Sequence, residues 1–290
     1  CYISGQFYNN PHYLQRTILE ITPTAMNHQK HPFGLNWNLK SLLLFHGIAA
    51  LLLASWVLPG TQALWQSVDD SVFFLLNGSL AEGEQWQYFW ALMNVRISDV
   101  IPMVIILLTL TFPILGLKGQ QLHSAFIGFV LLIILMWPFR ETLYVIAVSL
   151  GLSGDSPSLQ LQPAYMLAEI FPELGTKDRA DHSFPGDHSA VLWTWSGYLI
   201  LMLRSRLALI TLLLSVLFML PRLVAGAHWF TDNTVGGISV ALVTLSWAFH
   251  TPLLQWLTSL FCRYLSPFFY LLGRKVPGLA LLPFFRPAQL

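Results

Sequence analysis

Two polar stretches set in apolar sequence decide the fold: Ser183-Phe-Pro-Gly-Asp-His188 and Pro221-Arg-Leu-Val-Ala-Gly-Ala-His-Trp-Phe-Thr-Asp232. The residues between them are mostly apolar, and we place two consecutive membrane spans there. Ionisable groups are costly beside apolar spans and are usually functional where they gather. The two stretches therefore mark both the layout of the chain and its candidate site.

The composition is that of an integral membrane protein. Of the 290 residues, 55% are hydrophobic and 10% are charged, whereas soluble domains carry about 25% charged residues. The net charge is +1 and the basic residues are spread over many loops, so we exclude nucleic acid as a partner. Membrane lipids are the expected surroundings, and the oligomeric state is left open.

A spanning helix needs about 20 apolar residues, and the sequence predicts an all-α, multi-pass protein with about six such spans. They lie near residues 40–59, 100–117, 123–150, 188–203, 207–226 and 235–257. The third contains Pro138, where we expect a kink or a break. With both termini inside, ten Lys and Arg fall on the inner side and four on the outer. This bias places both polar stretches on the outer face of the membrane.

Aromatic residues at helical spacing predict interfacial helices on each side of the spans. One pair follows the first span, around 65–76 and 86–90, and another element follows the last span, around 261–272. We expect a polar tail over 1–38, one membrane domain over 39–257 and an inner interfacial tail over 258–290. The first 25 residues are either an extension upstream of a start at Met26 or an ordinary polar tail.

The residue types in the two stretches suit phosphoryl transfer. If the chain after Gly226 is helical, His228 and Asp232 share a face, so that the carboxylate holds one ring nitrogen and frees the other as nucleophile or base. The planar guanidinium of Arg222 suits a phosphoryl group, and Gly186 beside His188 allows a ligand to approach the backbone. Two histidines and an aspartate also suit a metal. A metal phosphatase, however, usually presents several carboxylates, so we expect neither metal nor cofactor.

The order of these motifs resembles the type 2 phosphatidic-acid phosphatase superfamily, which includes vanadium haloperoxidases. Arg222, His228 and Asp232 look like its third motif, and Pro185 to His188 look like its second. The match covers about the last half of the chain. Pro-Gly-Asp-His, with Thr176-Lys177-Asp178 upstream, is similar to the branch that transfers phosphate from undecaprenyl diphosphate to the 1-phosphate of lipid A.

The chain departs from the family pattern in three places. Asp187 stands near the place of a serine in the second motif, and Pro221 replaces a serine before the arginine. The first motif, a lysine followed by Arg-Pro, is absent. The nearby bases that remain are Arg140, Lys177 and Arg179, and the compensating partner of Arg140 is either Glu141 or a substrate phosphate.

The resemblance implies an enzyme of the bacterial inner membrane that acts at the periplasmic face on a lipid diphosphate. His228 would form a phosphohistidine, Asp232 would hold its ring and His188 would protonate the leaving group. The phosphate would be bound by Arg222, Lys177, Arg179, Gly186, Ser183 and Arg140. Asp187 and His182 would orient His188 or contact the acceptor. The preferred acceptor is lipid A 1-phosphate; the alternatives are hydrolysis by water and a non-catalytic lipid-phosphate carrier.

Overall fold

The computed structural model describes residues 33–113, 117, 120–203 and 205–286. Every regular element in these ranges is a helix, and no strand occurs in them, which confirms the all-α fold class. The predictions for residues 1–25 and for a start at Met26 lie outside the described residues. The α-helices are α2 (Leu39–Val57), α3 (Pro59–Gly78), α4 (Glu84–Met93), α5 (Val100–Thr111), α6 (Gln120–Ser149), α7 (Pro157–Gln160), α8 (Leu167–Ile170), α9 (Asp187–Leu203), α10 (Ile210–Val224), α11 (Gly237–His250) and α12 (Leu253–Lys275).

Short helical turns connect or extend several of these helices. The 3₁₀ turns are η2 (Ser79–Glu82), η3 (Arg96–Asp99), η5 (Pro172–Leu174), η6 (Arg206–Leu209), η8 (Leu279–Leu281) and η9 (Pro283–Phe285), and η7 (Asp232–Gly236) is one π-helical turn at the start of α11. Such π-helical turns within helices are rare and are frequent at functional sites.

Two helices, Leu39–Val57 and Gln121–Ser149, are each long and apolar enough to cross a membrane. The number rises to four if two bent helix pairs each form one span: α4 with η3 and α5, bent by 55°, and η7 and α11 with α12, bent by 71°. These counts concern only the described part of the chain. The structure thus supports membrane-crossing helices, and the full set of six spans stays a prediction.

The predicted element boundaries differ from the observed ones at two places. α6 continues through Pro138 as one helix, so the expected break does not occur. The predicted last span, 235–257, is divided because α11 ends at His250 and the chain turns into α12. The predicted boundary at residue 258 consequently falls inside α12.

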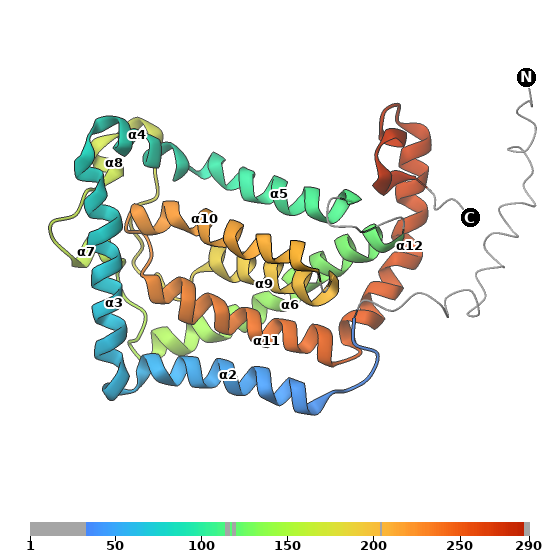
Figure 1. The fold of residues 1–290 in the computed structure, drawn as a ribbon, viewed down its shortest axis with the longest axis horizontal. Helices are drawn as coiled ribbons and strands as arrows, with labels where there is room; N and C mark the ends of the chain where they lie inside the picture. Colours follow the sequence, from blue (N-terminus) through green and yellow to red (C-terminus); the bar gives the residue numbers. More distant parts are fainter. Residues whose placement is uncertain (1–32, 114–116, 118–119, 204, 287–290) are drawn as a thin grey trace, which may run out of the picture. The chain divides into compact units, whose positions relative to one another are not determined.

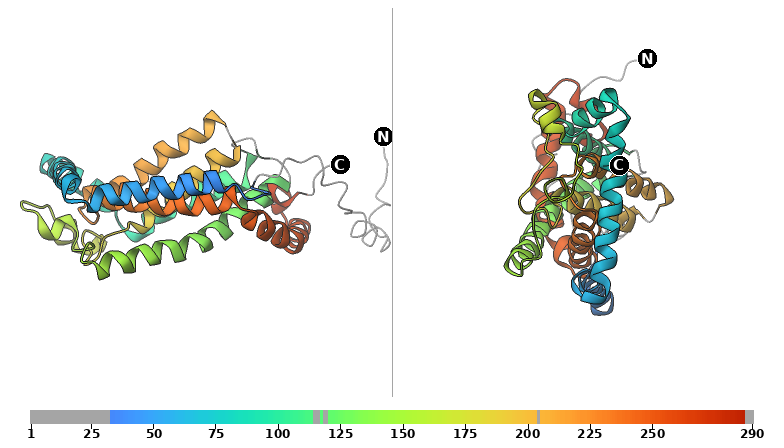
Figure 2. Two further views of the ribbon diagram at one scale, coloured as in Figure 1. Left: turned by 90° about the horizontal axis from the view of Figure 1, so that it is seen from below. Right: turned by 90° about the vertical axis from the view of Figure 1, so that its left-hand side faces the viewer.

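The axes of six helices are roughly aligned in the bundle, namely α2, α5, α6, α9, α10 and α11 (Figure 1). α3 crosses one end of this bundle and α12 crosses the other. The side view shows the same arrangement (Figure 2). α11 packs against α9, α2 and α6, and α10 packs against α9. The helices predicted at the interfaces therefore lie at opposite ends of the bundle.

The core of the bundle combines apolar packing with hydrogen bonds between helices. Trp195 and Tyr198 on α9 are fully buried; their polar atoms donate to Thr109 Oγ1 (3.1 Å) and to the carbonyl of Ala125 (2.9 Å). Satisfied bonds of this kind join apolar helices at little cost, because each buried polar atom keeps a partner. They join α9 to α5 and to α6 inside the bundle.

Candidate functional site

The two polar stretches meet at the end of the bundle that α3 and α4 cover (Figure 1). The N–H of Gly186, just before α9, donates to the carbonyl of Asp232 at 3.1 Å. A Cβ at Gly186 would lie 2.6 Å from Ser189 Oγ and 3.1 Å from Asn233 Oδ1. Gly186 thus allows close contact between the two stretches, whereas the sequence suggested that it admits a ligand.

The ring of His228 is held in one orientation. Its Nδ1 lies 3.0 Å from the carbonyl oxygen of Ser183 and 3.3 Å from Asp232 Oδ2. Because both neighbours are acceptors only, Nδ1 carries the proton, and the neutral ring has a free lone pair on Nε2. The Nε2 atom is buried and has no hydrogen-bond partner among the described residues. An imidazole in this state suits nucleophilic attack.

His228 and Asp232 contact each other by a different route from the expected one. His228 lies in a bend before the helix, and Asp232 begins η7. The carboxylate of Asp232 also accepts the backbone N–H of Trp229 at 2.8 Å, as acidic residues near helix starts often do. Local capping, rather than a shared helical face, brings the two side chains together.

Arg222 lies in the last turn of α10, which ends before Gly226 at a φ of +73°. Its guanidinium is buried and bonded to two residues that the motifs do not contain. Nη1 donates to the carbonyl oxygen and Oδ1 of Asn94, at 3.0 and 2.6 Å. Nη2 donates to both carboxylate oxygens of Asp99, at 3.0 and 2.8 Å. The predicted phosphate ligand therefore has protein partners on both terminal nitrogens.

His188, in the first turn of α9, lies between two carboxylates. Its Nδ1 is 3.0 Å from Asp187 Oδ1, and its Nε2 is 3.3 Å from Asp99 Oδ2. Since both ring nitrogens face acceptors, both act as donors, which favours the imidazolium. Burial acts to raise the pKa of Asp187, but the hydrogen bond and charge of His188 outweigh it and place that pKa below its ordinary value. A protonated His188 suits a general acid.

The predicted bases differ in the partners they have. Arg179 is half exposed and pairs with Asp178 (3.4 Å) and Glu169 (3.6 Å). The backbone carbonyl of Lys177 accepts from Asn94 Nδ2 at 2.6 Å, and its ammonium forms no ion pair within the described ranges. Lys177 is thus joined through Asn94 to Arg222, whereas Arg179 is bound to carboxylates of its own loop.

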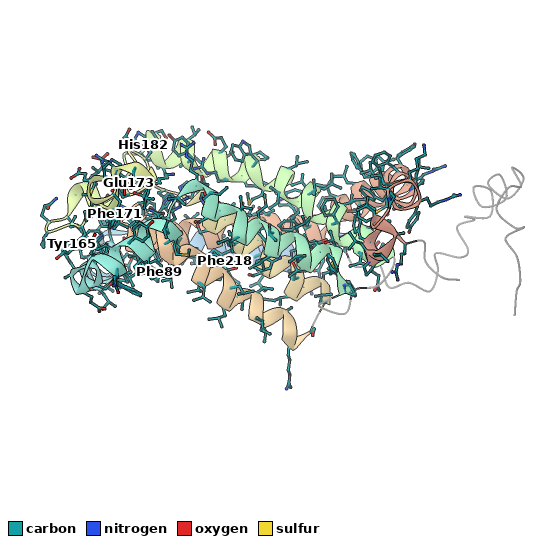
Figure 3. The ribbon with its side chains drawn as sticks, turned by 90° about the horizontal axis from the view of Figure 1, so that it is seen from above. Phe89, Tyr165, Phe171, Glu173, His182 and Phe218 are labelled. Carbon is teal, nitrogen blue, oxygen red and sulfur yellow. The ribbon has the colours of Figure 1, made fainter. Side chains whose placement is uncertain are left out.

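Arg140 and His182 lie beside the second motif. Arg140 pairs with Glu141 at 3.2 Å, stacks over the ring of Tyr144 and reaches the carbonyl of Pro185 at 3.4 Å. Glu141, one of the two partners that the sequence suggested for Arg140, therefore forms an ion pair with it. His182 Nδ1 lies 3.2 Å from the carbonyl of Ser153, at the end of the bundle where α4 and α8 also lie (Figure 3).

Ser183 contributes its backbone to the site. Its carbonyl oxygen holds His228, while its hydroxyl points to the carbonyl of Gly154 at 3.5 Å. Ser183 as a phosphate ligand stays a prediction, and its carbonyl oxygen is placed to accept the proton of His228 Nδ1.

Another carboxylate, that of Asp69 on α3, supports the segment before η7. It accepts the N–H of Thr231 at 2.9 Å and its hydroxyl at 2.6 Å. Burial raises the pKa of Asp69 to about 6. The two hydrogen bonds from Thr231 act to lower this pKa, and the negative charge of Asp232 acts to raise it. α3 therefore holds the segment that carries His228 and Asp232.

Asn94, Asp99 and Asp69 were not expected from the sequence as members of the site. A usable signal existed for Asp99, which directly precedes a predicted span on the outer side, as Arg222 lies near the outer end of another. No comparable signal marks Asn94. In the part of the chain that the structure describes, no three His, Cys, Asp or Glu side chains are grouped as metal ligands, and metal independence stays a prediction.

The family model of the PAP2 superfamily matches residues 153–255, which include every residue of both polar stretches. The chain belongs to this superfamily, and it is an enzyme of the phosphatase or phosphotransferase type. It is 30% identical over 227 residues to the lipid A 1-diphosphate synthase of Escherichia coli strain K12, a match that covers 77% of this chain and 93% of that protein. No solved structure matches the chain significantly.

Proposed function

We propose that this protein transfers a phosphoryl group from a polyprenyl diphosphate, such as undecaprenyl diphosphate, to lipid A 1-phosphate at the periplasmic face of the inner membrane. The observation that carries the proposal is the buried, unpartnered Nε2 of His228, whose ring is fixed by Ser183 and Asp232. A metal-free phosphoryl transfer needs such a nucleophile. The similarity to a lipid A 1-diphosphate synthase supports the choice of acceptor.

In the first step, Nε2 of His228 attacks phosphorus, and the bond between phosphorus and the leaving lipid phosphate breaks. The leaving oxygen takes the proton from Nε2 of His188, which two carboxylates keep protonated. Asp232 and the Ser183 carbonyl stabilise the Nδ1–H of the phosphohistidine. In the second step the acceptor oxygen attacks phosphorus, the bond between phosphorus and nitrogen breaks, and its electron pair returns to Nε2 of His228. His188 regains its proton from the acceptor or from solvent.

The phosphoryl oxygens need positive charge at this end of the bundle. Arg222 supplies one cation, and Lys177 is the best-placed base to replace the missing first motif, because Asn94 joins its backbone to Arg222. Arg179 and Arg140 already pair with carboxylates. Lys177 thus completes the phosphate clamp in this proposal.

In this proposal the chain crosses the membrane six times, and the site lies at the membrane surface. The helix ends that carry Asp99, His188, Arg222 and Asp232 meet at one end of the bundle, beside the crossing helix α3. A lipid diphosphate anchored in the outer leaflet brings its head group to this level. The proposed outer orientation rests on the distribution of Lys and Arg.

The test uses the purified full chain and labelled undecaprenyl diphosphate, with and without lipid A. Label should move to lipid A, and an acid-labile phosphoprotein should accumulate when the acceptor is omitted. His228→Ala should abolish both. A matched control is His250→Ala, since the Nε2 of His250 is also buried and unpartnered among the described residues but lies at the other end of α11.

Each outcome separates the candidate functions. Release of inorganic phosphate at the same rate with and without lipid A indicates hydrolysis by water. Binding of the lipid without turnover indicates a carrier. Turnover that survives in His228→Ala refutes the nucleophile.

A further inference from the structure

The carboxylate of Asp99 lies between the two groups that the reaction requires for its phosphate. It contacts Arg222 Nη2 with both oxygens, at 3.0 and 2.8 Å, and His188 Nε2 at 3.3 Å. Asp99 ends η3, immediately before α5, and belongs to neither sequence motif. Its negative oxygens therefore stand where oxygens of a transferring phosphoryl group would meet the same two side chains.

The donors of Arg222 show why this contact matters. A guanidinium has five N–H donors, and Nη1 is directed at Asn94, which is fully buried. Nη2 is directed at Asp99, whose side chain is 38% exposed. A phosphoryl oxygen that bonds to Nη2 therefore competes with the partly exposed carboxylate of Asp99, while the buried amide of Asn94 keeps Nη1.

His188 leads to the same conclusion. The proton on its Nε2, which the leaving oxygen takes in the proposed reaction, points at Asp99 Oδ2. The side chain of His188 is 35% exposed and that of Asp99 is 38% exposed, so both are accessible to a head group. One displacement therefore frees both the arginine and the acid.

We propose that Asp99 is a carboxylate gate that occupies the phosphoryl position until a more highly charged head group displaces it. A single carboxylate carries one negative charge, as does the phosphodiester of an ordinary phospholipid, so the two compete at equal charge. A terminal diphosphate carries more charge and binds the arginine in two-pronged fashion. The gate thus selects lipid diphosphates over the phosphodiesters that surround the protein in the bilayer.

The selection for diphosphates rests on the proposed function, whereas the competition between Asp99 and an anion does not. The two parts are therefore tested separately. Binding of inorganic phosphate, measured by titration calorimetry on the purified full chain in detergent, tests the gate without any turnover. Arg222→Gln in the same titration tests whether the anion binds at this site.

Asp99→Asn removes the competing charge and keeps an oxygen that can accept from Nη2. We expect it to bind inorganic phosphate at least tenfold more tightly than the wild type. Asp99→Glu restores the charge and should return the affinity to the wild-type level. Asp181→Asn is the matched control: Asp181 is exposed, has no bonded partner within the described ranges and carries the same charge, so its loss should leave phosphate affinity within about twofold.

Melting temperatures, measured by thermal unfolding with and without phosphate, distinguish a change in phosphate binding from a loss of folding. Asp99→Asn leaves the buried Arg222 without its carboxylate, so its melting temperature should fall, and phosphate should raise it by more than in the wild type because ligand binding stabilises the native state. In turnover assays the same variant should show stronger inhibition by phosphate and weaker discrimination against a soluble phosphodiester.

Equal or weaker phosphate binding by Asp99→Asn overturns the gate and makes Asp99 a positioning residue for Arg222 and His188. The absence of phosphate binding in both the wild type and Asp99→Asn overturns it as well. If Arg222→Gln binds phosphate as the wild type does, the anion site lies elsewhere and the proposed function fails with it. If the gate test succeeds but no lipid is turned over, only the proposed function fails.

Discussion

Replacing Asp232 with asparagine tests how the nucleophile is prepared. The substitution removes the charge next to Nδ1 of His228 and leaves the ring between an amide and the Ser183 carbonyl. Because the carbonyl lies closer to Nδ1 (3.0 Å) than the carboxylate does (3.3 Å), it can keep the proton on Nδ1 by itself. We therefore expect the reactive tautomer to survive in Asp232→Asn.

What the variant loses is the charge-assisted part of the hydrogen bond to the phosphohistidine. Hydrogen bonds to charged groups contribute about 1.5–3 kcal/mol, which corresponds to a loss of about 10- to 150-fold in the rate of phosphoprotein formation. Rapid-quench measurement of labelled phosphoprotein from a single turnover reports this step directly. The steady-state rate should fall by no more than the same factor.

Asp178→Asn is the control for damage to folding. Asp178 is buried to the same 1% exposure as Asp232 and accepts a backbone N–H, that of Ala168, at the same 2.8 Å, but it contacts neither catalytic histidine. The two variants should lose similar stability, and only Asp232→Asn should lose the fast step. A loss beyond about 10⁴-fold would mean that the carboxylate itself sets the tautomer, and an unchanged rate would remove Asp232 from the mechanism.

Three further results are expected. Asp187→Asn takes one of the two carboxylates from His188, so the alkaline limb of the pH–rate profile should move to lower pH by about one unit; an unmoved limb contradicts the role of His188 as acid. For Asp69, a pKa raised from 3.8 to about 6 means that its own contribution to stability is complete below pH 3.8 and is lost as the pH rises through 6, by about 3 kcal/mol. Between pH 5 and 8 the melting temperature of the wild type should therefore fall relative to Asp69→Asn, and parallel curves would contradict the raised pKa. Lys177→Gln should lower kcat/KM about 10- to 150-fold, whereas Arg179→Gln should stay within about threefold; equal losses would contradict the choice between the two bases.

The fold class followed from the sequence because apolar length and the scarcity of charge are local properties. The six predicted segments each contain an observed helix, and the aromatic periodicities correspond to α3, α4 and α12. The errors arose where packing decides the outcome. Of the kink or break expected at Pro138, the break does not occur because the helix continues, and the kink stays a prediction. The chain after His250 bends into α12, which packs against α6.

The site was predictable only where its residues lie close in sequence. The spacing of His228 and Asp232 brought them together correctly, although capping rather than a helical face makes the contact. The partners of Arg222 lie 123 and 128 residues away in sequence. No local pattern connects such distant groups, because the packing of α4 against α10 decides which polar residues meet.

The long-range contacts also explain how the chain manages without the first motif of its family. In the motif's absence, the buried arginine still needs to be held in place, and Asn94 does this while bonding to the carbonyl of Lys177. One amide thus connects the arginine to the loop that carries the remaining base. Asp99, on the same short segment as Asn94, pairs with the arginine. If Asp99 is the proposed gate, the segment from Asn94 to Asp99 combines a fixed anchor with a displaceable anion, and a change in either residue should alter how the site distinguishes one phosphate from another.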